Sequence, residues 1–117
     1  VDESPVRCPD QATSDRMVQL IEKTKAAQDS VGGIITCVAE DVPIGWGSPM
    51  YEKLNAQLAH AMFTLNAVKG FEMGDGFSST FRNGSQNNDA VVGGTNHDGG
   101  ITAGISNGKD IWFKVAF

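Results

Sequence analysis

The chain has 117 residues, of which 40% are hydrophobic and 20% are charged, and its formal net charge is −5 at pH 7. This length predicts that residues 1–117 form a single domain or a fragment of a longer protein. The acidic balance argues against a nucleic-acid surface, which needs a basic face. No apolar run approaches the ~18 residues of a membrane span, and no export signal precedes the first predicted helix, so we expect a cytoplasmic protein.

The two cysteines, Cys8 and Cys37, are too few for a disulfide framework. We expect both to be reduced, partly buried thiols, because a free cysteine behaves as a small hydrophobic residue. No Cys/His pair has the spacing of a metal site, so no metal is predicted.

Residues 10–28 are predicted to form the first helix, because Asp10 can cap it and apolar residues follow at near-helical spacing. Glycines and polar residues at 29–33 end it. The segment from Ile34 to Ala39 is apolar and rich in β-branched residues, which predicts a strand covered on both faces.

A second helix is predicted to open at Ser48-Pro49, which offers an N-cap and a proline in the first turn. Its apolar stripe comprises Tyr51, Leu54, Leu58, Ala61, Met62 and Leu65. A short strand is expected over 68–73.

Further strands are predicted near 79–82 and over 101–106 and 111–117. The last two bracket Asn107-Gly108, the strongest two-residue hairpin signal in the chain. In the final strand, one face carries Ile111, Phe113, Val115 and Phe117. The predicted fold class is therefore α+β, with two amphipathic helices packed on one face of a mostly antiparallel sheet.

Ten of the fourteen glycines fall between Gly70 and Gly108, in segments rich in Asn and Asp. Glycine lets a ligand approach the main chain closely, and Asn and Asp close turns through their side chains. Loops of this kind often carry function, so this region is the best candidate for a binding site. Its GDGF motif (74–77) is either a tight turn with Phe77 anchored in the core or a backbone cradle for a flat or anionic ligand.

The two histidines give weaker signals. His60 lies beside the apolar stripe of the second predicted helix, which indicates a surface or rim position. His97 precedes Asp98 in the glycine-rich region, where the pair either forms a turn or lines a pocket. Adjacent residues rarely face each other, so we do not expect them to act as a pair.

Six motifs occur in a fixed order along the chain: RCPD (7–10), DSVGG (29–33), PIGWGSPMYEKL (43–54), LNAVKGFEMGDGF (65–77), GSQNND (84–89) and NHDGGITAGISNG (96–108). Together they resemble the chorismate synthase family, and the resemblance covers essentially the whole chain. It implies part of that family's β-α-β sandwich. The implied reaction is the 1,4-elimination of phosphate from 5-enolpyruvylshikimate 3-phosphate, which gives chorismate in the shikimate pathway of aromatic amino acid biosynthesis.

The resemblance also implies a cofactor and partners. The family needs reduced FMN, is associated with NADP, and assembles as a homotetramer. Asn66 and Ala67 match its flavin-contacting Asn-Ala pair, and Ala103 matches a flavin-contacting glycine. The family's catalytic histidine motifs are absent, so no catalytic residue is assigned to this chain. Two alternatives remain: a non-catalytic flavin- or nucleotide-binding module, and an oligomerisation fragment.

Overall fold

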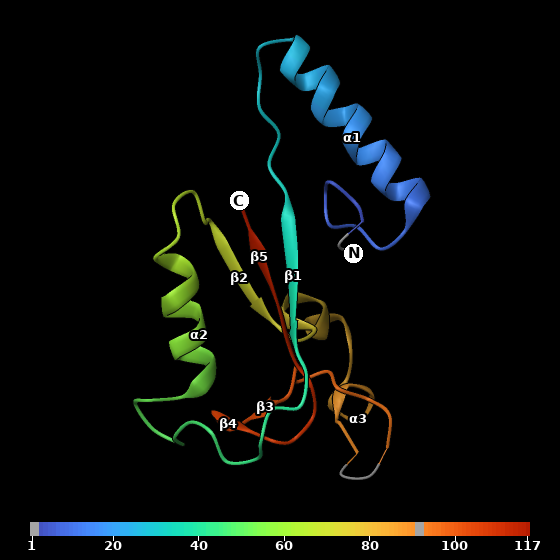
Figure 1. The fold of residues 1–117 in the computed structure, drawn as a ribbon. Helices are drawn as coiled ribbons and strands as arrows, with labels where there is room; N and C mark the ends of the chain where they lie inside the picture. The colour runs from blue at the N-terminus through green and yellow to red at the C-terminus, as the bar shows by residue number, and fades with distance from the viewer. Residues whose placement is uncertain (1–2, 91–92) are drawn as a thin grey trace. The chain divides into compact units, whose positions relative to one another are not determined.

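The computed structural model describes residues 3–90 and 93–117, and its contacts divide the chain into two units, Val1–Gly32 and Gly33–Phe117. The first unit contains α1 (Gln11–Ala26) (Figure 1). The carboxylate of Asp10 accepts a hydrogen bond from the Thr13 amide at 2.8 Å, which caps the helix. The first predicted helix and its cap are therefore confirmed.

The second unit is built on a three-stranded antiparallel sheet in the order β1-β5-β2. The strands are β1 (Ile34–Ala39), β2 (Gly70–Met73) and β5 (Ile111–Ala116). In the central strand, Phe113 lies opposite Cys37 of β1 and Met73 of β2. Because every strand pair is antiparallel and α2 (Leu54–Phe63) packs on β2, the predicted α+β class is confirmed.

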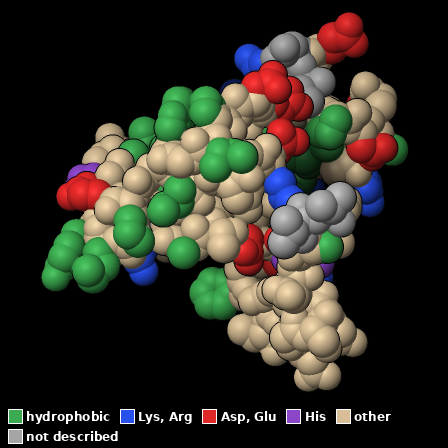
Figure 2. All heavy atoms as spheres, turned by 90° about the horizontal axis from the view of Figure 1, so that it is seen from below, with side chains coloured by type: hydrophobic (Ala, Val, Ile, Leu, Met, Phe, Trp, Pro, Cys, Tyr) green, Lys and Arg blue, Asp and Glu red, His purple; other side chains and the backbone are tan. Residues whose placement is uncertain are grey.

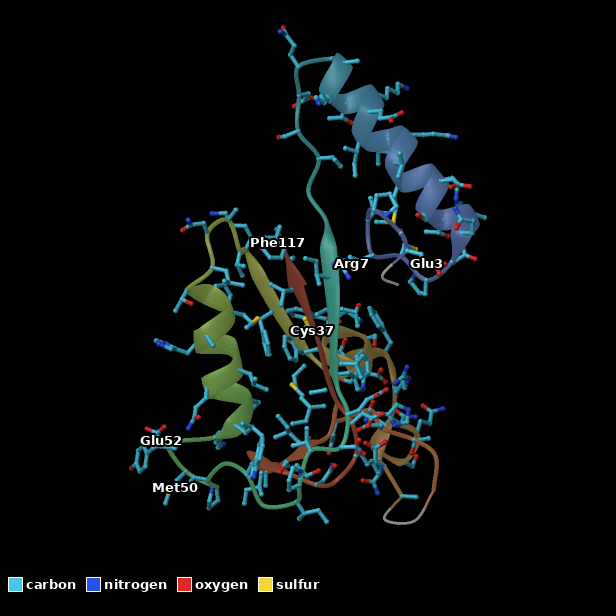
Figure 3. All side chains as sticks on the ribbon, in the orientation of Figure 1. Glu3, Arg7, Cys37, Met50, Glu52 and Phe117 are labelled. Atoms are coloured by element: carbon cyan, nitrogen blue, oxygen red, sulfur yellow. The ribbon has the colours of Figure 1, made fainter. Side chains whose placement is uncertain are left out.

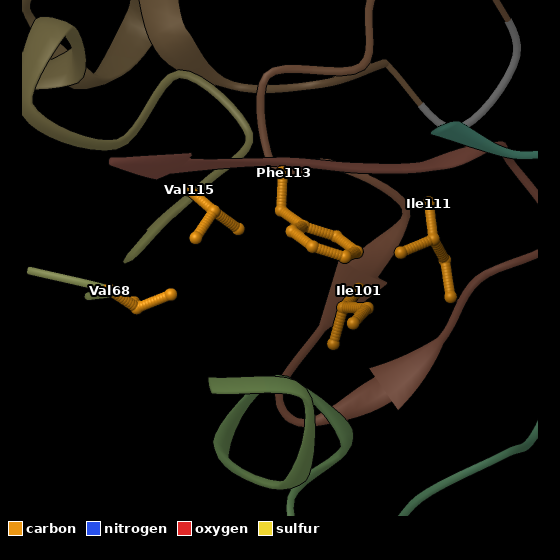
Figure 4. Packing of buried hydrophobic residues seen from close by; sticks show 5 residues of the cluster. All are labelled: Val68, Ile101, Ile111, Phe113 and Val115. Atoms are coloured by element: carbon orange, nitrogen blue, oxygen red, sulfur yellow. The ribbon is translucent and has the colours of Figure 1, made fainter. Parts of the chain in front are cut away.

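The core of this unit lies against the apolar face of β5 (Figure 4). Burial alternates along the strand, as predicted for Ile111, Phe113 and Val115. The Phe113 ring lies 5.2 Å from that of Phe71, centroid to centroid. The other buried members of the cluster are Val68 and Ile101, and half-buried Cys37, Val42, Leu54, Leu58, Met62, Phe71 and Met73 pack around them.

The prediction that the first strand is covered on both faces is wrong. β1 is an edge strand, paired only with β5, and five of its six residues are exposed. Ile34 is 68% exposed and Val38 is 58% exposed. Composition indicated the strand correctly, but burial depends on neighbours that composition cannot specify. Cys37 is half-buried, and both cysteines are free thiols, as expected.

The second helix begins later than predicted, at Leu54 rather than at Ser48. The Ser48 hydroxyl donates to the Met50 carbonyl and caps nothing, and Tyr51 has a φ of 62°, which interrupts a right-handed helix. Met50 and Glu52 therefore lie in the segment that leads into α2 (Figure 3). Of the predicted stripe, Leu54, Leu58 and Met62 pack on the core, whereas Tyr51, Ala61 and Leu65 are exposed.

The glycine-rich region differs from its prediction in two elements. The segment Gly76–Phe81 forms a 3₁₀ helix, η1, where a strand was expected, and α3 (Gly84–Asn87) follows it. The predicted hairpin around Asn107-Gly108 is also wrong. Instead β3 (Ile101–Thr102) pairs with β4 (Ile105–Ser106), while β5 lies between β1 and β2. The central position buries the apolar face of β5, which a hairpin with β4 alone would not do.

Among the described residues, no helix is both long and apolar enough to cross a bilayer.

We predict that Phe113→Ala lowers the free energy of unfolding of the second unit by about 3–5 kcal/mol, because it removes the central side chain of the core. The matched control is Phe77→Ala, since Phe77 is 78% exposed. Its effect should stay within about 0.5 kcal/mol. Urea unfolding measures both, and equal losses would contradict this description of the core.

Candidate functional site

The Asn66-Ala67 turn follows α2 directly. The Leu65 amide donates to the Met62 carbonyl, and the Val68 amide donates to the Leu65 carbonyl, so the chain reverses immediately after the helix. Ala67 has a φ of 68°, and both turn residues are exposed. Within residues 3–90 and 93–117, no hydrogen bond engages the Asn66 side chain. Its carboxamide is therefore available to a ligand as both donor and acceptor.

Ala103 lies in the turn between β3 and β4. It has a φ of 54°, and the following Gly104 has a φ of 88°. The Gly104 carbonyl accepts the Leu54 amide at 2.9 Å, so this turn satisfies one of the amides that have no partner within the helix at the start of α2. A Cβ at Gly104 would lie 2.8 Å from the Ser48 carbonyl oxygen. The turn is therefore tightly held, and the small Ala103 side chain is exposed.

The two turns lie at opposite ends of α2. This helix has ten residues, which corresponds to about 15 Å. The structure therefore does not bring Asn66 and Ala67 together with Ala103. A single ligand that contacts all three positions therefore has to be elongated. Small exposed side chains in left-handed turns fit such a ligand, because they leave the main chain open to close approach.

GDGF is a turn, but Phe77 does not anchor it. The Phe77 side chain is 78% exposed, and its amide donates to Glu72 Oε2 at 3.1 Å. Glu72 also accepts from Lys114 Nζ at 2.7 Å, and this ion pair chiefly lowers the pKa of the Glu72 carboxyl. A carboxylate at the end of β2 therefore fixes the start of η1.

The GDGF turn also packs tightly against the later part of the glycine-rich region. A Cβ at Gly74 would lie 2.2 Å from the His97 carbonyl oxygen and 2.7 Å from the Gly99 amide. The Asp75 amide donates to the His97 carbonyl at 2.9 Å. These contacts leave no room for a side chain at Gly74.

Asp89 is a residue that the sequence analysis missed. Its carboxylate accepts the amides of His97 at 2.9 Å and Asp98 at 3.0 Å, so it joins two parts of the same loop region that lie eight and nine residues apart. His97 Nδ1 is buried and lies 2.8 Å from Asp89 Oδ1. The only sequence signal was the Asp that ends GSQNND, which gives no indication of its partner.

The electrostatics around Asp89 favour the charged carboxylate. Burial, the largest single influence, raises its pKa, but hydrogen bonds from Asp98, His97 and Thr95 together outweigh burial and lower the pKa to about 2. The side chain is 9% exposed. A buried carboxylate with this many donors is a structural clamp on the glycine-rich region.

The histidines have different surroundings. His97 Nε2 lies 3.9 Å from Asp75 Oδ2, and Asp75 in turn pairs with Arg82. His97 therefore faces Asp75 and Asp89 rather than its neighbour Asp98, as expected for adjacent residues. His60 is exposed, as predicted, and lines a shallow hollow of about 490 Å³ with Tyr51, Glu52, Ala56 and Gln57. In the described part of the chain, no three His, Cys, Asp or Glu residues are grouped as metal ligands.

The antiparallel sheet, the packed helix and the glycine-rich turns can be compared with known proteins. The family model described as chorismate synthase matches residues 1–117. The chain therefore belongs to the chorismate synthase family.

Individual relatives agree with this assignment. Chorismate synthase of Parabacteroides distasonis is 52% identical over 99% of this chain and 34% of its own length. That of Porphyromonas gingivalis is also 52% identical, over all of this chain and 34% of its own length. A solved structure described as a crystal structure of chorismate synthase matches with a TM-score of 0.88 and 32% identity, over 98% of this chain and 37% of that one. The chain thus spans about a third of the length of these relatives.

The Asp89 clamp predicts a dependence of stability on pH. Because the carboxyl pKa falls from an ordinary 3.8 to about 2 on folding, its contribution is present above about pH 4 and is lost as the pH falls toward about 2. The loss is expected to be on the order of 1–2 kcal/mol. Urea unfolding across this range should show a shallower acid dependence in Asp89→Asn than in the unmodified protein. An identical slope in both would show that Asp89 is not the group responsible.

The left-handed turns predict a stabilising substitution. Ala103→Gly relieves the steric cost of a Cβ at φ 54° and is expected to raise the unfolding free energy by about 0.5 kcal/mol. Ala59→Gly in the interior of α2 is the matched control and should lower it by about 1 kcal/mol. The midpoints of denaturant unfolding distinguish the two, and a loss of stability in Ala103→Gly would contradict the turn geometry.

Proposed function

We propose that the protein containing this chain is a chorismate synthase, which converts 5-enolpyruvylshikimate 3-phosphate into chorismate and inorganic phosphate. The observation that carries the proposal is the match to this family along residues 1–117. The reaction is a 1,4-elimination, in which one C–H bond and one C–O bond to phosphate break and a new double bond completes a conjugated diene. No net oxidation or reduction occurs.

Reduced FMN is the proposed cofactor, and when bound it lends electron density to the substrate so that the allylic phosphate leaves more easily. The proposed contribution of this chain is to bind and orient the flavin. The free carboxamide of Asn66 offers a donor and an acceptor, and Ala67 and Ala103 let the flavin approach the main chain. We assign no proton transfer to His97, because it does not match the family's catalytic histidine motifs.

The wider assignments are proposals that rest on the family. They are action in the cytoplasm, a link to NADP through flavin reduction, and a homotetramer. Exposed apolar surface supports an association role: Ile34, Ile44, Trp46, Met50 and Tyr51 are each more than half exposed. Apolar side chains reach the surface in several places (Figure 2). Surface of this kind typically marks a contact with another protein or with more of the same protein.

The test of the flavin contact is Asn66→Asp in the full-length protein. The substitution replaces an amide donor with a negative charge beside an anionic reduced flavin or its phosphate. We expect FMN affinity to fall about tenfold or more, which is the effect of losing one hydrogen bond and adding repulsion. Quenching of flavin fluorescence measures the affinity of oxidised FMN, and anaerobic titration measures that of the reduced form.

Asn88→Asp is the matched control, because it makes the same chemical change at the exposed C-cap of α3. It should leave the FMN affinity unchanged. If Asn66→Asp also binds FMN with unchanged affinity, Asn66 is not part of the site.

A further inference from the structure

Asn96 has a partner for each polar group of its side chain. Nδ2 donates to the Asp110 carbonyl at 2.8 Å, and Oδ1 accepts the Gly100 amide at 2.8 Å. Its own carbonyl accepts the indole Nε1–H of Trp112 at 2.9 Å. Asn96 therefore joins the glycine-rich region to β3, through Gly100, and to β5, through Asp110 and Trp112.

These bonds fix Gly100, the residue directly before β3, which we call the root of the β3-β4 hairpin. β3 begins at the residue after Gly100, and the hairpin has only two residue pairs of its own. A Cβ at Gly100 would lie 2.4 Å from the Asp110 carbonyl oxygen, so the two backbone segments pack closely there. The β4 side of the hairpin is held by Ser106, whose amide donates to the Trp46 carbonyl at 2.9 Å and whose hydroxyl donates to the Pro43 carbonyl at 2.6 Å. The bonds of Asn96 hold the β3 side.

We propose that Asn96 is a positioning residue of the flavin site, which sets the place of the Ala103 turn without touching the flavin. The inference rests on the proposed function, because Ala103 matters only if the flavin lies against it. At the tip of the hairpin, the Leu54 amide donates to the Gly104 carbonyl of the turn. At the root, the Asn96 side chain accepts the Gly100 amide. Loss of the Asn96 side-chain hydrogen bonds would let Ala103 move relative to the flavin.

Asn96→Asp separates this role from a general structural one. An ionised carboxylate can accept the Gly100 amide, but it repels the Asp110 carbonyl. A protonated carboxyl can accept from one and donate to the other, as the carboxamide does. The effect of Asn96→Asp on flavin binding should therefore diminish as the pH falls.

The experiment measures the FMN affinity of the full-length protein at about pH 8 and at about pH 4, which is close to the ordinary pKa of an Asp carboxyl, well below its melting temperature. The nearby titratable and charged groups are Asp89, His97 and Asp98 in the glycine-rich region and Lys109 and Asp110 before β5. They are the same in every variant, so each affinity is expressed relative to the unmodified protein at the same pH. Asn88→Asp again controls for the added charge.

We expect Asn96→Asp to bind FMN about tenfold more weakly at the higher pH and to recover part of that loss at the lower pH, where about half of the introduced carboxyls are protonated. Asn96→Ala should be weaker at both. Unchanged affinity in Asn96→Asp at both pH values, or a loss that does not recover, would overturn the assignment. Failure of the unmodified protein to bind FMN would instead refute the proposed function, and this assignment with it. If Asn96→Ala does not fold, the recovery of Asn96→Asp still decides the question.

Discussion

The structure depends on the central strand β5, which organises the second unit through both its side chains and its backbone. Its apolar face carries Ile111, Phe113 and Val115 into the core, where α2 packs. The backbone of Trp112 accepts the Gly74 amide at 3.1 Å and donates to the Gly99 carbonyl at 3.2 Å. The strand that forms the core therefore also determines where the glycine-rich region lies.

This double role explains the glycines at the crossing point. A Cβ at Gly99 would lie 2.7 Å from both the Gly74 amide and the Trp112 carbonyl oxygen. Close main-chain packing holds these loops, and the buried Asp89 carboxylate and the Asn96 carboxamide fix their ends. The described residues of a region that reads as a ligand loop in the sequence are thus closely packed here, and close packing can preorganise a binding site.

The sequence predicted the features that depend on interactions between residues close together in the chain. The cap at Asp10, the strand Ile34–Ala39 and the alternation along β5 follow from side-chain chemistry and period. Tertiary contacts decided the rest. The start of α2 depends on the Gly104 carbonyl, which lies in a distant turn, and the Asn107-Gly108 signal was overridden by burial of β5 between two strands. The Asp89 clamp joins residues that the sequence does not place together, whereas the three flavin positions came only from family resemblance and stay predictions.

The central claim is that the two turns at the ends of α2 form one side of a flavin site. A structure of the full-length protein with FMN bound tests it most directly. We expect a flavin in hydrogen-bond or van der Waals contact with Asn66 and Ala67 at one end of α2 and with the Ala103 turn at the other. A well-ordered flavin that contacts neither turn would contradict it.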